Sequence, residues 1–257
     1  MDLITNAMRA LAFLSRITVP QSWFDGYSGS LADTVRGFPL AGIIIALPAS
    51  LVLFAGDLLD LPEAVTALLA ITTLIVTTGG LHEDGLADVA DGFYGGSSTE
   101  RRLEIMKDSS IGSYGTLALI ISTLLRTALL ATILDELDVF QVILVIIGTE
   151  AVNRGVLVKF WQSLSSVRAG GVADSAGAPN ATAANFALIF ASVAGATGYG
   201  AAGGPLAVIL AACLTALVFF GFSALCRTKI GGQTGDTLGA MQQMATIALQ
   251  LGLVIAL

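Results

Sequence analysis

Long apolar stretches follow one another along this chain, and polar residues are concentrated between them. A helix that spans a membrane needs about 20 mostly apolar residues, because each residue adds about 1.5 Å and the hydrocarbon layer is about 30 Å thick. Two of the apolar stretches are short, so the pattern predicts six or seven spanning helices. The stretches are 37–56, 63–79, 112–134, 139–155, 183–202, 205–225 and 240–257.

The N-terminal segment has a different pattern. Leu3, Ala7, Leu11 and Leu14 recur at helical spacing, while Arg9 and other polar residues interrupt the apolar run. A helix with one apolar stripe and a polar remainder typically lies in the plane of the membrane interface. We therefore expect an N-terminal interfacial helix before the first span.

The composition agrees with a membrane protein. Apolar residues make up 55% of the 257 residues and charged residues 12%, against about 25% charged residues in ordinary soluble domains. The net charge of −7 excludes a nucleic-acid-binding protein that works through bulk positive charge. These numbers predict an all-α, polytopic integral membrane protein, with residues 1–257 forming one domain.

Basic residues fall in alternate connections between the expected spans. Cytoplasmic loops carry an excess of Lys and Arg, so this alternation places the N-terminus and the loops at about 79–111, 154–182 and 226–239 in the cytoplasm. Arg126 is the one basic residue expected inside a span. The others are Arg9, Arg16, Arg36, Arg101, Arg102, Lys107, Arg154, Lys159, Arg168, Arg227 and Lys229.

A stripe of acidic residues lies in the first of these loops, in the segment GGLHEDGLADVADGFYGG at 79–96. Asp84, Asp88 and Asp91 stand at i, i+4 and i+7, which places three carboxylates on one face of a helix. Carboxylates at such short separations repel one another unless a cation neutralises them. Their oxygen atoms are ligands that suit Mg²⁺ or Mn²⁺. A solvated acidic helix face is the alternative. His82, the single histidine, lies beside the stripe and could act on a reacting phosphate or form a structural hydrogen bond.

Two further segments on the same side carry candidate chemistry. In ERRLEIMKDSSIGSYG, Asp108 could add a metal ligand or hold Arg101, and Lys107 could bind a phosphate. An ordinary amphipathic surface helix is the alternative there. In GGQTGDTLGA at 231–240, Gln233, Thr234 and Asp236 fit a loop around a polar ligand, or a turn in which Thr234 or Asp236 caps a helix.

Charged residues inside spans usually pair with one another or serve a site. We expect Arg126 and Glu150 to form such a pair. Arg154 lies one helical turn beyond Glu150, at the cytoplasmic end of its span, and is better placed to reach a phosphate.

The three segments GGLHEDGLADVADG, EIMKDSSIGSYG and GGQTGDTLGA together resemble the signature stretches of the cobalamin synthase family, the adenosylcobinamide-GDP ribazoletransferases. RITVP at 16–20 and GFPLAG at 37–42 extend the resemblance over most of the chain. The family pattern H-x-D-G-x-x-D-x-x-D-G falls on His82, Asp84, Gly85, Asp88, Asp91 and Gly92 without a departure.

The resemblance implies a Mg²⁺-dependent enzyme of the bacterial or archaeal inner membrane. Such an enzyme joins adenosylcobinamide-GDP to α-ribazole or its 5′-phosphate and releases GMP, so its partners are these small molecules and the lipid bilayer, with no nucleic acid. The oligomeric state stays open.

Phosphoryl-type displacement is catalysed mostly by positioning and charge neutralisation, and this chemistry assigns a role to each candidate. His82 or Asp91 would accept the proton of the attacking hydroxyl. The metal ligands would be Asp84, Asp88, Asp91, Asp108 and Asp236, and the substrate would be bound by Arg101, Lys107, Arg154, Gln233 and Thr234.

Two other functions compete with this hypothesis. Asp88 to Gly92 match the start of the acidic signature of CDP-alcohol phosphotransferases, which make phospholipids, but Gly95 and Gly96 stand where that signature has Ala-Arg. A secondary transporter would place ionisable residues near the bilayer midplane, often within internal repeats. The sequence shows no repeat, and its candidate residues lie mainly in loops or at span ends.

Overall fold

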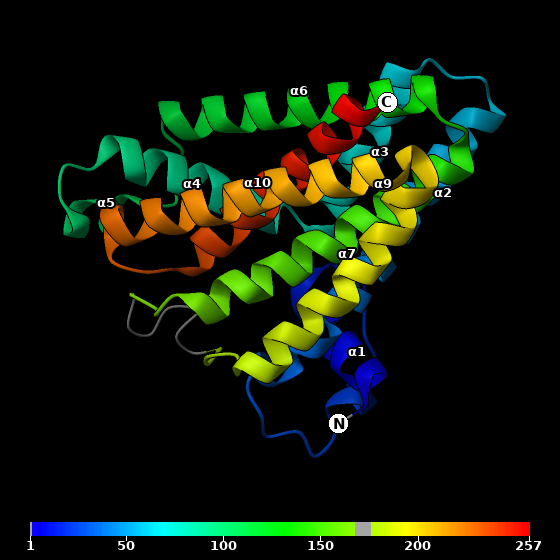
Figure 1. The fold of residues 1–257 in the computed structure, drawn as a ribbon. Coiled ribbons are helices and arrows are strands. Elements are labelled where there is room, and N and C mark those ends of the chain that lie inside the picture. Colours follow the sequence, from blue (N-terminus) through cyan, green and yellow to red (C-terminus); the bar gives the residue numbers. More distant parts are fainter. Residues whose placement is uncertain (1, 168–175) are drawn as a thin grey trace.

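The computed structural model describes residues 2–167 and 176–257, and within them the chain folds as a bundle of helices (Figure 1). The only β-type pairing in this part is a single bridge between Ser166 and Gln233. The helices are α1 (Leu3–Leu14), α2 (Phe38–Leu58), α3 (Glu63–Thr78), α4 (Leu81–Gly95), α5 (Thr99–Ile105), α6 (Ser113–Glu136), α7 (Val139–Ser163), α9 (Ala181–Ile230) and α10 (Gly235–Ala256), with short 3₁₀ helices at Gln21–Phe24 and Leu31–Gly37. The all-α membrane fold predicted from the sequence is therefore confirmed.

The number of spans depends on how two bent elements are counted. Five helices are long and apolar enough to cross a membrane, and a sixth span results if α3 and α4, which meet at 90°, are taken together. Helix α9 has 50 residues and would be about 75 Å long if straight, more than twice the hydrocarbon thickness. Gly203 and Gly204 leave the helical conformation just before Pro205 and divide α9 into two helices, at the predicted break between 202 and 205.

Helices continue into all three of the connecting segments predicted at 79–111, 154–182 and 226–239, and the predicted helical stripe of aspartates lies in the first. Helices α4 and α5 occupy most of the first, α7 runs on to Ser163, and α9 ends only at Ile230. Beyond the expected end of α7, buried residues prolong its packed surface, namely Val156, Leu157, Val158, Phe160 and Trp161. Arg168 and its neighbours up to 175 lie outside the described residues.

The expected N-terminal helix is present as α1, but its polar residues do not face away from the protein. Asn6 and Arg9 are buried, and Nε of Arg9 donates a hydrogen bond to the carbonyl of Trp23 at 2.7 Å. Ile4 and Phe13 are instead exposed, at 54% and 42%. Helix α1 thus packs against the bundle with a partly polar face and leaves apolar side chains on its outer surface.

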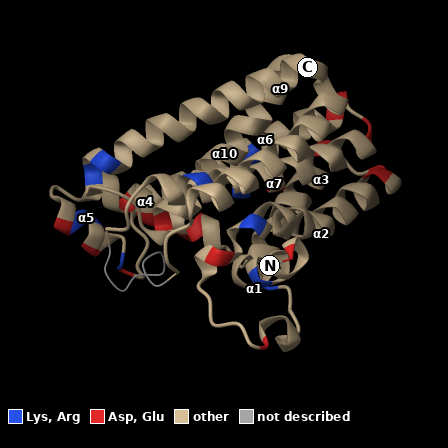
Figure 2. Ribbon diagram, turned by 60° about the horizontal axis from the view of Figure 1, so that its bottom comes forward, with Lys and Arg blue, Asp and Glu red and all other residues tan. Residues whose placement is uncertain are grey.

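Basic residues gather toward one end of the bundle, whereas acidic residues lie at both ends (Figure 2). The connections at one end contain Asp57, Asp60, Glu63, Asp135 and Asp138. Basic residues lie at the other end, on α5, at the end of α9 and around α1. The basic residues predicted in alternate connections of the sequence thus lie toward one end of the bundle.

Candidate active site

One wall of a polar cleft of about 930 Å³ is formed by α4, which contributes Glu83, Asp84 and Asp88. The position of α4 depends on Gly79 and Gly80, whose φ angles of 66° and 71° lie in the left-handed region that favours glycine. These two residues turn the chain by 90° between α3 and α4. The predicted acidic stripe is therefore helical, and two of its three carboxylates open on the cleft.

The opposite wall is formed by the loop after α5, which contributes Lys107 and Asp108. One carboxylate oxygen of Asp108 accepts hydrogen bonds from the hydroxyl and the backbone N–H of Ser110, at 2.6 and 2.9 Å. These two bonds lower the pKa of Asp108 below its usual value, so its carboxylate is ionised at neutral pH. The structure thus brings together Asp84, Asp88, Asp108 and Lys107, as the sequence predicted.

Asp91 has different surroundings from the other two aspartates of the stripe. Its two carboxylate oxygens accept hydrogen bonds from the backbone N–H groups of Gly112 and Gly115, at 2.7 and 2.9 Å. These glycines lie at the start of α6, and an added Cβ on either would collide with the Asp91 carboxylate. Asp91 therefore anchors α4 to the N-terminus of α6, where unpaired N–H groups favour a negative charge.

His82 lies on the other side of α4, where it lines a second cavity of about 210 Å³ together with Asp84 and Asp236. The imidazole is 2% exposed, and its Nε2 atom has no hydrogen-bond partner in the part of the chain that the structure describes. Asp84 lines both this cavity and the larger cleft. It therefore stands where the two spaces meet.

Close packing of α4 against α10 brings Asp236 to this cavity. A Cβ added to Gly85 would lie 2.6 Å from the backbone oxygen of Asp236, and one added to Gly239 would lie 3.2 Å from Cα of His82. Larger residues at these two positions would force the helices apart. Gly85 and Gly239 thus allow the two helices to approach closely.

Gln233 and Thr234 hold the start of α10. Gln233 pairs through its backbone with the segment after α7, donating to Ser165 at 2.9 Å and accepting from Val167 at 3.0 Å. The Thr234 hydroxyl caps α10 by accepting from the N–H of Thr237. This confirms the expected cap. Both side chains are about 1% exposed, and neither lines the cleft.

Neither of the two arginines that were expected to bind phosphate lines the cleft. Arg101 is largely exposed and pairs with Glu104 at 2.6 Å. Arg154 is fully buried and bound to Glu150 one turn before it. The sequence placed Arg154 at the end of a span, whereas α7 continues two turns further and encloses it.

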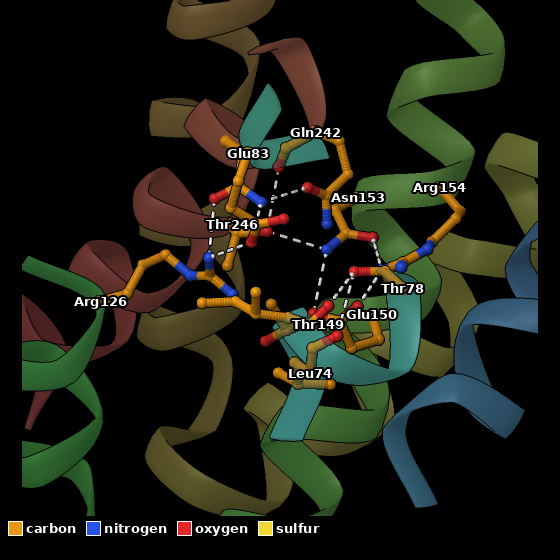
Figure 3. Close-up of polar contacts among 12 residues, drawn as sticks. Leu74, Thr78, Glu83, Arg126, Thr149, Glu150, Asn153, Arg154, Gln242 and Thr246 are labelled. Atoms are coloured by element: carbon orange, nitrogen blue, oxygen red, sulfur yellow. Dashed lines mark hydrogen bonds and ion pairs between the residues drawn. The ribbon is translucent and has the colours of Figure 1, made fainter. Parts of the chain in front are cut away.

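A polar network with two ion pairs lies inside the bundle, behind α4 (Figure 3). Arg126 donates to Glu83 at 2.9 Å and to Gln243 at 2.8 Å. Gln243 also donates to Glu83, at 2.9 Å. The predicted Arg126–Glu150 pair is therefore wrong, because each residue is neutralised by a different partner.

Asn153 connects the second ion pair of the network, Glu150–Arg154, to α10. Its amide nitrogen donates to Glu150 at 3.2 Å and to the Thr246 hydroxyl at 2.8 Å, and its amide oxygen accepts from Arg154 at 2.9 Å. The network thus joins α4, α6, α7 and α10 at one level of the bundle (Figure 3). It fixes the rotation of α4 through Glu83, the residue next to Asp84.

The cleft residues fit a divalent cation by their chemistry. Within residues 2–167 and 176–257, no group of three or more His, Cys, Asp or Glu side chains is placed to hold a metal by itself. Mg²⁺, however, is usually held by one or two carboxylates, with water and substrate phosphate completing its shell. Asp84 and Asp88, one turn apart and facing one cleft, can supply such a pair, whereas Asp91 is already engaged.

Arg16 is a candidate substrate-binding residue that was not predicted as one from the sequence. It lines the cleft, and its guanidinium lies against Gly79, where a Cβ would collide with it. Its backbone N–H donates to the carbonyl of Thr77 at 2.7 Å. Glu83 was also missed, although a glutamate beside a predicted metal-binding aspartate was a visible signal.

Comparison with known proteins agrees with the motifs. The sequence model of a family described as cobalamin-5-phosphate synthase matches residues 6–254. A relative from Brucella ovis named adenosylcobinamide-GDP ribazoletransferase is 46% identical over 255 residues, which cover 99% of this chain and 98% of the relative. Relatives of the same name from Brucella canis and Brucella melitensis match to the same extent. No solved structure matches the chain.

Proposed function

The chain belongs to the cobalamin-5-phosphate synthase family, and on this premise we propose that it joins adenosylcobinamide-GDP to α-ribazole or its 5′-phosphate with release of GMP. One observation carries the site assignment: two separate sequence motifs line one cleft. The first contributes Asp84 and Asp88, and the second contributes Lys107 and Asp108. Carboxylates for a cation and a lysine for phosphate oxygens are what a diphosphate substrate requires.

The reaction is a displacement at the phosphorus that carries the cobinamide. The hydroxyl oxygen of the ribazole ribose forms a bond to this phosphorus, the bond from phosphorus to the oxygen that bridges to GMP breaks, and the hydroxyl proton goes to a base. Mg²⁺ in the cleft would neutralise charge on the diphosphate. Asp84 and Asp88 would hold it, with Asp108 on the facing wall.

Among the two candidate bases, the surroundings favour His82. Its Nε2 atom has no partner within residues 2–167 and 176–257, and His82 lines a cavity shared with Asp84, so this nitrogen is available next to the acidic cleft. Asp91 instead uses both carboxylate oxygens to bind backbone N–H groups. We assign proton acceptance to His82 and an anchoring role to Asp91.

The proposal is tested with the full chain purified in detergent. Incubation with adenosylcobinamide-GDP, α-ribazole and Mg²⁺ should yield GMP and the joined corrinoid in equal amounts by mass spectrometry. Absence of GMP with the unaltered protein would contradict the transferase assignment. Equal yield in the presence of a strong chelator would contradict the Mg²⁺ requirement alone.

Three variants test the roles of the residues in the same assay. Asp84→Asn and Asp88→Asn should abolish turnover, whereas Asp135→Asn, at the opposite end of the bundle, should leave it unchanged. His82→Ala should lower the rate about 10²- to 10⁴-fold if the imidazole is the base. An unchanged rate would assign His82 to structure.

The relation to the membrane completes the proposal. We propose that the basic end of the bundle, which includes the cleft, faces the cytoplasm, and that the protein resides in a bacterial inner membrane. The gathering of Lys and Arg toward this end supports the orientation (Figure 2), because Lys and Arg are enriched in cytoplasmic loops.

A further inference from the structure

An apolar groove of about 370 Å³ lies between α7 and the two halves of α9, on the outer surface of the bundle. Small residues of α9, Gly195, Ala196, Ala211 and Ala212, leave the space open. Three hydroxyls line the groove: that of Ser192 is bonded to the carbonyl of Leu188 at 2.8 Å, that of Tyr199 to Thr149 at 2.7 Å, and that of Thr215 has no partner among the described residues. The groove shares no lining residue with the acidic cleft, and the proposed reaction does not use it.

The surface around this groove faces lipid. Ile189, Val193, Ile209 and Leu217 of α9 are each more than half exposed, on helices that are long and apolar enough to span a membrane. Water has few polar partners in such a groove. Its occupant must therefore be an apolar chain that reaches it from the bilayer.

The length of the groove matches one leaflet. On the first half of α9 the lining extends from Leu188 to Tyr199, which is about 16 Å at 1.5 Å per residue. Half of a hydrocarbon layer of about 30 Å is about 15 Å. A single acyl chain of one leaflet would lie along it.

A cation marks the end of the groove where a headgroup would lie. Lys159 lines the groove four residues before α7 ends, and its ammonium donates to Gln162 and Asn185 at 2.9 and 3.0 Å. Both partners are neutral amides, and among the described residues Lys159 forms no ion pair. An ammonium has three donors, so one is left for an anionic oxygen.

We propose that this groove binds one anionic phospholipid, with an acyl chain between α7 and the halves of α9 and the headgroup phosphate on Lys159. Non-specific contact with bulk lipid requires no particular headgroup, whereas this site prefers a negative charge. One lysine near the headgroup contributes about a fivefold preference for an anionic lipid over a zwitterionic one.

The test uses native mass spectrometry of the detergent-purified full chain, titrated with phosphatidylglycerol or phosphatidylcholine of the same acyl chains. We expect one tight phosphatidylglycerol adduct with the fivefold preference. Lys159→Gln should remove the preference, while Arg227→Gln, an exposed cation at the same end outside the groove, should keep it. A preference that survives Lys159→Gln would overturn the headgroup assignment.

A second pair of variants tests the groove itself. Ala212 is exposed and lines the groove, whereas its neighbour Cys213 is exposed and does not. Ala212→Phe should therefore reduce binding of both lipids, and Cys213→Phe, which adds comparable bulk outside the groove, should not. Equal binding by the two variants would overturn the proposal. A dimer that Ala212→Phe dissociates would show instead that a second copy of the chain occupies the groove.

Discussion

Asp84 and Asp91 lie two turns apart on α4 and belong to one sequence motif, yet their surroundings differ. Asp84 is exposed at the junction of the cleft and the smaller cavity. Asp91 is 9% exposed and holds two backbone N–H groups of α6. The same residue type therefore serves chemistry at one position and helix packing at the other.

Substitution of Asp91 should lower stability before it affects chemistry. In Asp91→Asn the amide can replace one acceptor but places an N–H against the other donor. We expect a loss of about 1–3 kcal/mol in the free energy of unfolding, measured by denaturant titration in detergent. Asp84→Asn should unfold at the same denaturant concentration as the unaltered protein. Equal stability of Asp91→Asn would contradict the anchoring role.

Arg16 should bind the diphosphate of the substrate, because it lines the same cleft as Lys107 and forms no ion pair among the described residues. Arg16→Gln should raise KM for adenosylcobinamide-GDP about tenfold or more, the value of a charged hydrogen bond, and leave KM for α-ribazole unchanged. Arg101→Gln, which removes an exposed arginine outside the cleft, is the matched control. An equal effect of both variants would exclude a specific role for Arg16.

At the scale of elements, the ends of helices were the least predictable feature. The pattern placed the end of a span at 155 because Arg154 is charged, but Glu150 neutralises Arg154 within the same helix, so α7 continues to Ser163. The break in α9 was predictable, since two glycines precede Pro205 where the apolar run already has the length of one span. Local sequence reveals such a break but not the partner of a buried charge.

Some features of the candidate site were likewise predictable from local sequence, and others depend on contacts between distant segments. Helical spacing alone predicted that Asp84 and Asp88 share a face, and the structure places both on one cleft. The contribution of Arg16 depends on α1 and α3 coming together, which spacing within one segment cannot reveal. The same holds for Asp91, whose partners Gly112 and Gly115 lie on another helix.

The Glu83–Arg126 pair ties α4 to α6 and should be sensitive to the loss of one partner. The two side chains are 13% and 3% exposed, so Arg126→Met leaves a buried carboxylate without its counter-ion. We expect a loss of about 3–5 kcal/mol, measured by denaturant titration in detergent. Adding Glu83→Gln should restore much of it. The exposed Arg101→Met should change stability little, and a double variant as unstable as the single one would contradict the explanation.

At the scale of the whole molecule, the position of the basic residues predicts orientation. In a variant without its two native cysteines, Thr228→Cys reports on the basic end and Asp57→Cys on the acidic end, and both positions are exposed. A thiol reagent that does not cross membranes should label Thr228→Cys only in inside-out vesicles and Asp57→Cys only in right-side-out vesicles. The reverse result would place the cleft outside the cytoplasm.

The buried ion pairs also constrain the order in which the chain is inserted during its synthesis. Glu150 and Arg154 lie on one helix, so α7 enters the bilayer with its charges already balanced. Arg126 follows Glu83 by 43 residues, and the two meet only when α6 docks on α4. A lone arginine in hydrocarbon is costly, so the biosynthetic machinery must hold α6 and α4 together before either is released into lipid.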